Sequence, residues 1–208
     1  MIPRMRVPLL VVSILSIAGC EAGKPPVRPE DLRGPRLTRA IPRPDLALVR
    51  TDGRPLDFRA DTRGTLTFLF FGYTNCPDVC PLHMGNLAAV LRELPAELAG
   101  RVRLVFVTTD PERDTPERLS SWLANFDSTF IGARGSPEAL EAAQRSLGMP
   151  VASRDAQAPD SGGYTVSHGA HLWAFTPDDS AHVVYPMGMG RDVLAADIPL
   201  LLRLWPGK

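Results

Sequence analysis

Two cysteines separated by three residues are the feature of this sequence with the clearest chemical potential. Cys76 and Cys80 follow a β-branched and aromatic run, residues 65–71, and precede a segment with helical spacing. A strand-to-helix junction would place both thiols near helix N–H groups, which lower a thiol pKa. Thiolates at such a junction are soft ligands for Cu(I) and are also competent for disulfide exchange. The CxxxC spacing alone leaves both chemistries open, together with an inert disulfide or a buried pair.

The elements that must position these thiols are predicted from periodicity and from turn and cap residues. We expect strands at 46–49, 56–58, 65–71, 101–107, 130–131, 171–175 and 181–185. We expect helices between Pro81 and Pro95, from Thr115 to Phe126, from Ser136 to Gly148, and over 193–204, where Pro199 should kink or divide the last one. Strands that alternate with helices and end in a hairpin predict an α/β domain, with a mixed central sheet flanked by helices.

Length and composition limit the class of protein. The chain has 208 residues, of which 44% are hydrophobic, so one domain with a real core is expected and global disorder is excluded. Its 23 basic and 23 acidic residues balance, which leaves no electrostatic footprint for nucleic acid. Three cysteines are too few for a disulfide scaffold. Walker, Rossmann and HExxH patterns are absent from the sequence.

Four segments, in order along the chain, carry a resemblance to a known family. They are FGYTNCPDVCP at 71–81, DPERDTP at 110–116, FIGARG at 130–135 and YTVSH at 164–168. Together they resemble the Sco/SenC family of thioredoxin-like copper chaperones for cytochrome c oxidase assembly. Two departures stand out: Ala133-Arg134 replace the usual pair of an FxGLTG element, and Ser167 stands where Asp is usual. The resemblance covers about residues 44–204 and implies a thioredoxin-like fold.

The resemblance also implies a copper site. In that family the two cysteines and the histidine of the last segment bind copper, which corresponds here to Cys76, Cys80 and His168. Two thiolates and one imidazole can hold Cu(I), and the imidazole also suits Cu(II). We therefore expect one copper per domain, and we expect Ser167 to loosen the support that orients His168. Asp78 is expected to cap the helix or tune the thiolates.

The implied function is delivery of copper to the CuA-bearing subunit of cytochrome c oxidase, or reduction of the thiols of that site. An extracytoplasmic copper donor or a thiol reductant would be a further partner. Asp110 and Arg113 are expected to stabilise a loop near the site.

Other candidate ligands receive a smaller role. His171 lies an odd number of residues after His168, so within a strand the two would point to opposite faces and only one would reach the site. His83 and Met84 are expected on the surface or in the core of a helix, and His182 is expected to be structural or exposed. Two methionines, Met187 and Met189, could offer thioethers to Cu(I), although a loop before the last helix is the simpler interpretation.

The N-terminal segment predicts a membrane anchor. Residues 1–19 have a basic start and a short apolar run, which is typical of a signal peptide, and 17–20 resemble a bacterial lipobox with Cys20 as the lipidated residue. The proline- and arginine-rich stretch 20–44 is expected to be a solvated tether, and 45–208 the copper-binding domain. The protein is therefore expected at the cell membrane, lipid-anchored and facing the extracytoplasmic or periplasmic side.

Two enzyme hypotheses compete with the copper chaperone. The same cysteines could serve a thioredoxin-type thiol-disulfide oxidoreductase, but such enzymes carry CxxC and a proline just before the strand that faces the cysteines. Residues 166–170 hold His168 there and no proline. A thiol peroxidase would place a Thr, for which Thr74 is the candidate, and an Arg beside one reactive cysteine. We therefore favour a metallochaperone over an enzyme and keep the oxidoreductase as the alternative.

Overall fold

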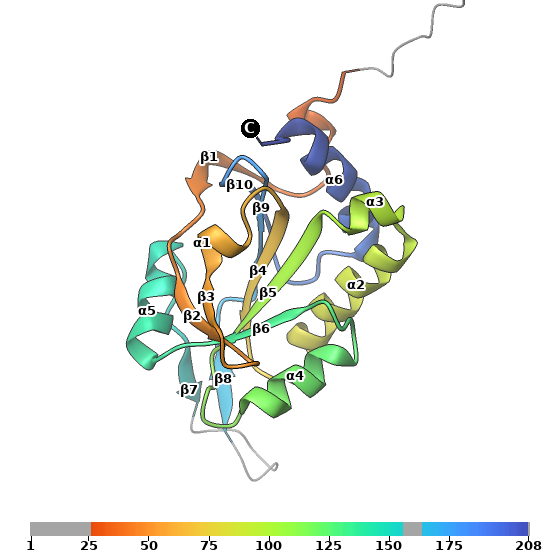
Figure 1. Cartoon of the computed structure of the whole chain (residues 1–208). Helices are drawn as coiled ribbons and strands as arrows, with labels where there is room; N and C mark the ends of the chain where they lie inside the picture. Colours follow the sequence, from red (N-terminus) through yellow and green to blue (C-terminus); the bar gives the residue numbers. More distant parts are fainter. Residues whose placement is uncertain (1–25, 156–163, 208) are drawn as a thin grey trace, which may run out of the picture.

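The computed structural model describes residues 26–155 and 164–207, and Figure 1 shows how their elements are arranged. The predicted signal segment, residues 1–19, and the predicted lipidation site Cys20 lie outside these residues. Within the described part of the chain, none of the helices has the length and apolar character needed to cross a membrane.

A mixed eight-stranded sheet, in the order β1-β10-β9-β4-β5-β6-β2-β3, forms the centre of the fold. Its strands are β1 (Arg36–Pro42), β2 (Ala47–Arg50), β3 (Pro55–Asp57), β4 (Leu66–Gly72), β5 (Val102–Thr108), β6 (Ile131–Arg134), β9 (Leu172–Phe175) and β10 (Ser180–Tyr185). Neighbours pair in parallel in β4–β5–β6 and antiparallel elsewhere. The predicted mixed sheet and both predicted hairpins, β2–β3 and β9–β10, are confirmed.

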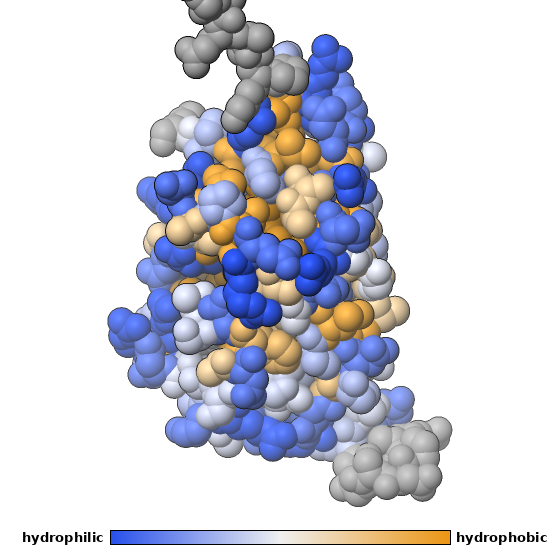
Figure 2. Space-filling model, turned by 90° about the vertical axis from the view of Figure 1, so that its right-hand side faces the viewer, coloured by the Kyte–Doolittle hydropathy of each residue, from blue (hydrophilic) through white to orange (hydrophobic). Residues whose placement is uncertain are grey.

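Helices cover both faces of this sheet. They are α1 (Phe58–Asp61), α2 (Val79–Glu93), α3 (Ala96–Ala99), α4 (Pro116–Ala124), α5 (Pro137–Ser146) and α6 (Arg191–Leu204), and a 3-10 turn, η1 (Pro29–Asp31), precedes the first strand. One core lies between the sheet and α2, α4 and α6, and a second lies between the sheet and α1 and α5. Figure 2 turns the side bearing α2, α3 and α6 toward the viewer, where apolar side chains gather between hydrophilic ones.

The central strand β4 explains the continuous apolar run in the sequence. Every residue of β4 is buried. Phe68 and Phe70 face the core under α2, and Leu69 and Phe71 face the core under α5. A strand with helices on both faces must be apolar on both, which is why 65–71 shows no polar alternation.

The segment before residue 45 departs from the expected tether. β1 pairs with the edge of β10, and Arg43 is only 1% exposed. The Arg43 guanidinium donates hydrogen bonds to four backbone carbonyls, those of Thr62, Thr65, Phe175 and Thr176. Buried carbonyls need donors, and this arginine supplies them. The expectation of a solvated spacer is therefore wrong for residues 36–43.

Two helix predictions also need correction. The helix that carries Cys80, α2, begins at Val79 rather than after Pro81. Pro81 is tolerated in the first turn because the N–H that a proline lacks would have no helical partner there. Of the two effects expected of Pro199, division does not occur, because α6 is continuous from Arg191 to Leu204. Leu194, Ile198 and Leu201 of α6 are fully buried, and their burial, at roughly 1.5–3 kcal/mol each, exceeds the roughly 3 kcal/mol cost of an interior proline.

A small two-stranded sheet was not predicted. β7 (Ser153–Asp155) pairs antiparallel with β8 (Thr165–Ser167) beside the main sheet. Both strands are short, and only Val166 among their residues is buried. Such segments lack the alternation by which strands are recognised. β8 matters because it leads directly into His168.

Candidate metal centre

The two thiols lie where β4 gives way to α2. β4 ends at Gly72, and a tight loop follows in which the Cys76 N–H donates to the Tyr73 carbonyl at 3.2 Å. α2 then begins at Val79, so Cys80 lies in its first turn. The predicted strand-to-helix junction at the cysteines is confirmed. Both cysteines are free thiols.

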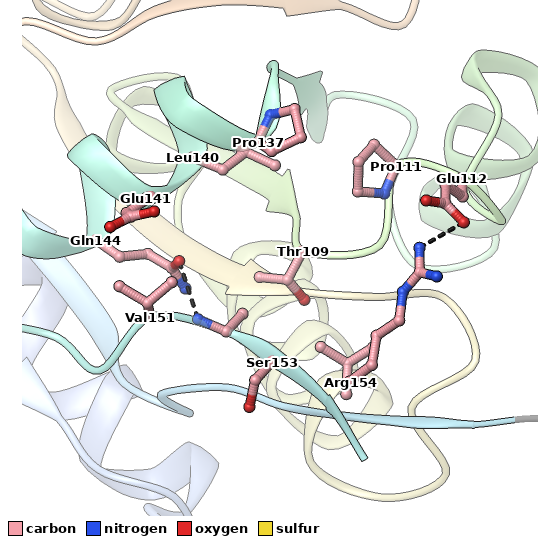
Figure 3. A pocket seen from close by; sticks show the side chains of 12 residues that line it. Thr109, Pro111, Glu112, Pro137, Leu140, Glu141, Gln144, Val151, Ser153 and Arg154 are labelled. Atoms are coloured by element: carbon pink, nitrogen blue, oxygen red, sulfur yellow. Dashed lines mark hydrogen bonds and ion pairs between the residues drawn. The ribbon is translucent and has the colours of Figure 1, made fainter. Parts of the chain in front are cut away.

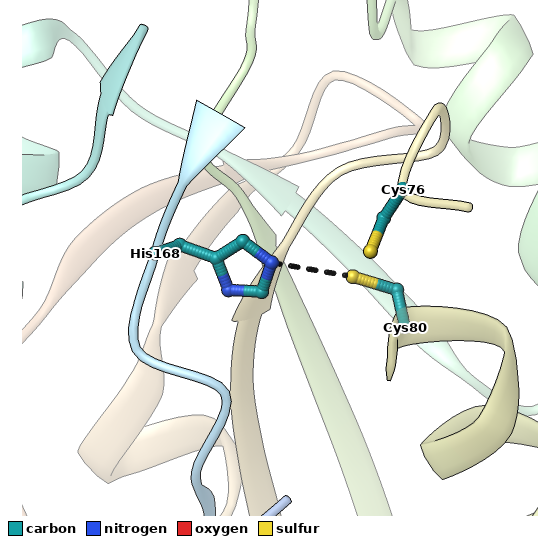
Figure 4. A group of neighbouring side chains, drawn as sticks. All are labelled: Cys76, Cys80 and His168. Carbon is teal, nitrogen blue, oxygen red and sulfur yellow. Dashed lines mark hydrogen bonds between the residues drawn. The ribbon is translucent and has the colours of Figure 1, made fainter. Parts of the chain in front are cut away.

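The structure brings the three predicted ligands together although His168 is far away in sequence. The sulfurs of Cys76 and Cys80 and a ring nitrogen of His168 all lie within 4.8 Å of one another. The Cys80 Sγ to His168 Nε2 distance is 3.6 Å, and Figure 4 shows both sulfurs and the ring turned toward a common point. These are soft and borderline donors, a set suited to Cu(I) and also to Zn²⁺.

Aromatic side chains hold the His168 ring. In edge-to-face contacts, the centroid of the His168 ring lies 5.7 Å from that of Tyr73 and 6.0 Å from that of Phe70. The ring Nδ1 also lies 3.4 Å from the Gly169 carbonyl oxygen. The residue before His168, Ser167, is exposed and lies opposite Ser153 in the β7–β8 sheet. The ring is therefore oriented by these aromatic and backbone contacts.

His171 does not join the group of three ligand atoms, although it lines the same cavity as His168. Strand alternation, the expected reason for excluding His171, does not hold. Residues 168–171 lie between β8 and β9 and are not a strand, so alternation of side chains does not apply to them.

A buried carboxylate fixes the cysteine loop. Asp114 is fully buried and accepts hydrogen bonds from the Thr74 N–H at 3.0 Å and the Thr74 hydroxyl at 2.6 Å. It also accepts one from the Thr108 hydroxyl at 2.6 Å, at the end of β5. A buried charge is stable only when its lone pairs are bonded in this way. Asp114 therefore ties the loop after β4 to the neighbouring strand.

A second polar cluster holds the chain that carries His168. Asp110, 2% exposed, accepts from the Tyr164 hydroxyl at 2.7 Å and forms an ion pair with Arg113. Arg113 donates to the Tyr164 carbonyl at 2.9 Å, and its guanidinium lies 3.7 Å from the centre of that ring. The predicted role of Asp110 and Arg113 near the site is confirmed, and their target is the residue that precedes β8.

Sequence reasoning missed Asp114 and Tyr164 as supporting residues. The DPERDTP segment contains a signal for Asp114. The helix N-cap at Thr115 explains Thr115 and the proline after it, but it leaves the preceding acid, Asp114, without a role. Asp78 occupies the N-cap position of α2, yet its side chain makes no capping bond. Its backbone N–H instead donates a hydrogen bond to the Cys76 thiolate, which lowers the pKa of Cys76. Asp78 therefore tunes the thiolate without capping the helix.

The remaining histidines and methionines divide between core and surface. His83 and Met84 are buried on α2, as expected for core positions. His182 lies 2.8 Å from an Asp178 carboxylate oxygen and stacks on Trp205, which gives it a structural role. Met187 is 62% exposed.

The two thiols differ strongly in acidity. The pKa of Cys76 falls to about 3, mainly because the Cys80 thiol donates a hydrogen bond to it, with further help from His168 and backbone N–H groups. The pKa of Cys80 rises above its ordinary value because the residue is buried and faces the Cys76 thiolate. The metal-free pair therefore carries one negative charge, placed on the more exposed sulfur.

The site opens into a cavity of about 590 Å³. Cys76 and His168 line this cavity, whereas Cys80, fully buried, does not. A second cavity of about 260 Å³ lies between α5 and β7 and shares Val166 as a wall (Figure 3). There Gln144 accepts from the Ala152 N–H at 3.1 Å, and no thiol or imidazole lines it, so it is separate from the candidate metal centre.

Comparison with known proteins agrees with this geometry. The sequence profile of the SCO1/SenC family matches residues 38–203, so the chain belongs to this family. The bovine (Bos taurus) mitochondrial SCO2 homologue is 31% identical over 85% of this chain and 68% of its own. The solution structure of apo Sco1 from Thermus thermophilus has a TM-score of 0.72 at 32% identity, and it covers 82% of this chain and 97% of its own.

A copper-bound structure is also similar. That of Bradyrhizobium japonicum ScoI has a TM-score of 0.66 at 29% identity, over 77% of this chain and 98% of its own. The predicted thioredoxin-like α/β fold is confirmed by these neighbours.

The acidity of Cys76 predicts its reactivity. A lowered pKa keeps Cys76 a thiolate as pH falls, so iodoacetamide should alkylate it at about pH 5.5, where an ordinary thiol is protonated. Cys80→Ala removes the hydrogen-bond donor and should raise the pKa of Cys76 and abolish this reactivity, whereas Cys80→Ser keeps a donor and should retain most of it. Mass spectrometry across a pH series measures both, and alkylation of wild type only above about pH 8 would contradict the assignment.

The packing around Cys80 predicts a steric effect at Gly72. A β-carbon at Gly72 would lie 2.7 Å from the Cys80 sulfur, so Gly72→Ala should lower the free energy of unfolding by about 1–3 kcal/mol. Gly85, on α2, has nothing within 4 Å of such a carbon. Gly85→Ala should therefore raise stability by about 0.5–1 kcal/mol. Urea denaturation measures both variants. A Gly72→Ala variant as stable as the wild type would show that the Cys80 thiol is not tightly packed against Gly72.

Proposed function

We propose that this chain is a copper-binding protein that acts in the assembly of cytochrome c oxidase. The observation that carries the proposal is the convergence of Cys76, Cys80 and His168 within 4.8 Å. Support comes from family membership and from relatives whose structures hold copper, those of Bradyrhizobium japonicum and Arabidopsis thaliana. A further structural neighbour is described as a member of the Sco family of cytochrome c oxidase assembly proteins.

Each ligand has a distinct part in holding the copper cargo. The Cys76 thiolate is already charged and lines the cavity, so it would meet an incoming ion first. Cys80 would then lose its proton as the ion replaces it between the two sulfurs. His168, held by Tyr73 and Phe70, would complete a three-coordinate site suited to Cu(I).

We propose delivery of copper to the CuA-bearing oxidase subunit as the activity of this site. A thiolate that lines the cavity, paired with a fully buried thiol, also suits a thiol-disulfide oxidoreductase, which is the second candidate and would reduce the thiols of that subunit. Delivery is favoured because the imidazole, 3.6 Å from the buried sulfur, completes a set of three metal-ligand atoms, whereas thiol exchange requires only the two sulfurs.

Replacement of His168 tests the metal site. His168→Ala should weaken Cu(I) binding by more than about a hundredfold, since even supporting residues cost 10–100-fold. His171→Ala is the matched control, because His171 lines the cavity but lies outside the ligand group, and it should bind as wild type does. Competition titration with a Cu(I) chelator and metal analysis measure both.

Two outcomes would contradict the proposal. Equal copper affinity in the wild type and in His168→Ala would remove the three-ligand site. Robust insulin reduction that survives in His168→Ala would favour the oxidoreductase instead.

We further propose that the protein is anchored to the outer side of the cytoplasmic membrane through a lipid on Cys20. The support is the signal-like segment 1–19 and the lipobox-like residues 17–20. The full chain expressed in a bacterium should partition into the detergent phase, and Cys20→Ala should move it to the aqueous phase because the acyl chains are lost. Equal partitioning of the two chains would remove the lipid anchor from the proposal.

A further inference from the structure

The inner site, formed by Cys76, Cys80 and His168, can exchange metal on one side only. Cys80 is fully buried and does not line the 590 Å³ cavity, whereas Cys76 and His168 do. An ion held by these three residues must therefore enter and leave through the cavity. Any further donor on the wall of that cavity lies on the exit route.

Met187 is such a donor. It lines the same cavity as Cys76 and His168, and its thioether is a soft ligand that matches Cu(I). Among the other residues that line the cavity, His171 is the remaining nitrogen donor of metal-binding type, and its Nδ1 is buried. The Met187 thioether is thus the one soft donor besides Cys76 among the residues that line this cavity.

The local backbone presents Met187 outward. The Met189 N–H donates to the Pro186 carbonyl at 3.3 Å, and Gly188 has φ of +83°, which is the pattern of a type II turn with Met187 at its second position. Met187 is 62% exposed, whereas Met189, two residues on, packs against the core. Packing accounts for Met189 but gives no reason for an exposed methionine on the wall of the cavity that Cys76 and His168 line.

We propose that Met187 is a transfer ligand, which binds Cu(I) transiently as it leaves the inner site for a soft ligand of the recipient. This inference rests on the proposed copper function and extends it. The bond from copper to His168 breaks as the bond to the Met187 sulfur forms, and a donor of the recipient then displaces the remaining ligands. Copper stays Cu(I) throughout, no electron moves, and solvent returns a proton to Cys80 as the ion departs.

The test measures how fast copper leaves. Full-length protein loaded anaerobically with one Cu(I) is mixed with excess bicinchoninate, and the absorbance of the chelate is followed by stopped flow. Met187→Leu should still load one copper through the inner three ligands. Its transfer should be about tenfold slower, the change expected when one weak contact is lost from the transition state. The control Met189→Leu removes a thioether from the same segment, and it should transfer at the rate of wild type, as should His171→Ala.

The outcomes separate this inference from the copper function. If wild type loads copper and Met187→Leu transfers it equally fast, the transfer role is wrong and the copper site stands. Equal slowing in Met187→Leu and Met189→Leu would assign the effect to the loop and overturn the inference. Slowing in His171→Ala alone would give the role to the imidazole. If wild type binds no copper, the proposed function and the inference both fail.

Discussion

The buried carboxylate of Asp114 is the constraint on which the metal centre depends. Three hydrogen bonds from Thr74 and Thr108 compensate its charge, and they can form only when the loop after β4 lies against the end of β5. The adjacent Arg113 extends the same segment toward Tyr164 and the chain that leads to His168. One short stretch between β5 and α4 therefore positions both halves of the ligand set.

The asymmetry of the two thiols connects this scaffold with metal exchange. Burial keeps Cys80 protonated, and the proton it shares with Cys76 stabilises a thiolate on the sulfur that faces the cavity. The closed side of the site is apolar core, formed by residues such as Phe70 and Met84. The open side carries polarizable donors, and Met187 is the most exposed of them. A site built in this way can hold an ion firmly and still release it in one direction.

Much of the fold was predictable because local signals and tertiary packing agree. β4 is apolar throughout since helices cover both of its faces, and Thr115 and Ser136 cap the helices that their sequences predict. The predictions failed where a distant partner overrides the local pattern. Arg43 looks like part of a solvated tether until the carbonyls that it satisfies are known, and the short strands β7 and β8 exist only through each other.

The sequence by itself determined the chemistry: two thiols at a strand-to-helix junction, a histidine in a recognisable segment, and a family in which these bind copper. Only the tertiary structure decided that His168, 88 residues from Cys80, lies 3.6 Å from its sulfur. It also decided that Cys80 is closed off while Cys76 and Met187 share a cavity. The reason is that local sequence sets propensity and spacing, whereas the strand order that places β9 beside β4 sets which distant residues meet.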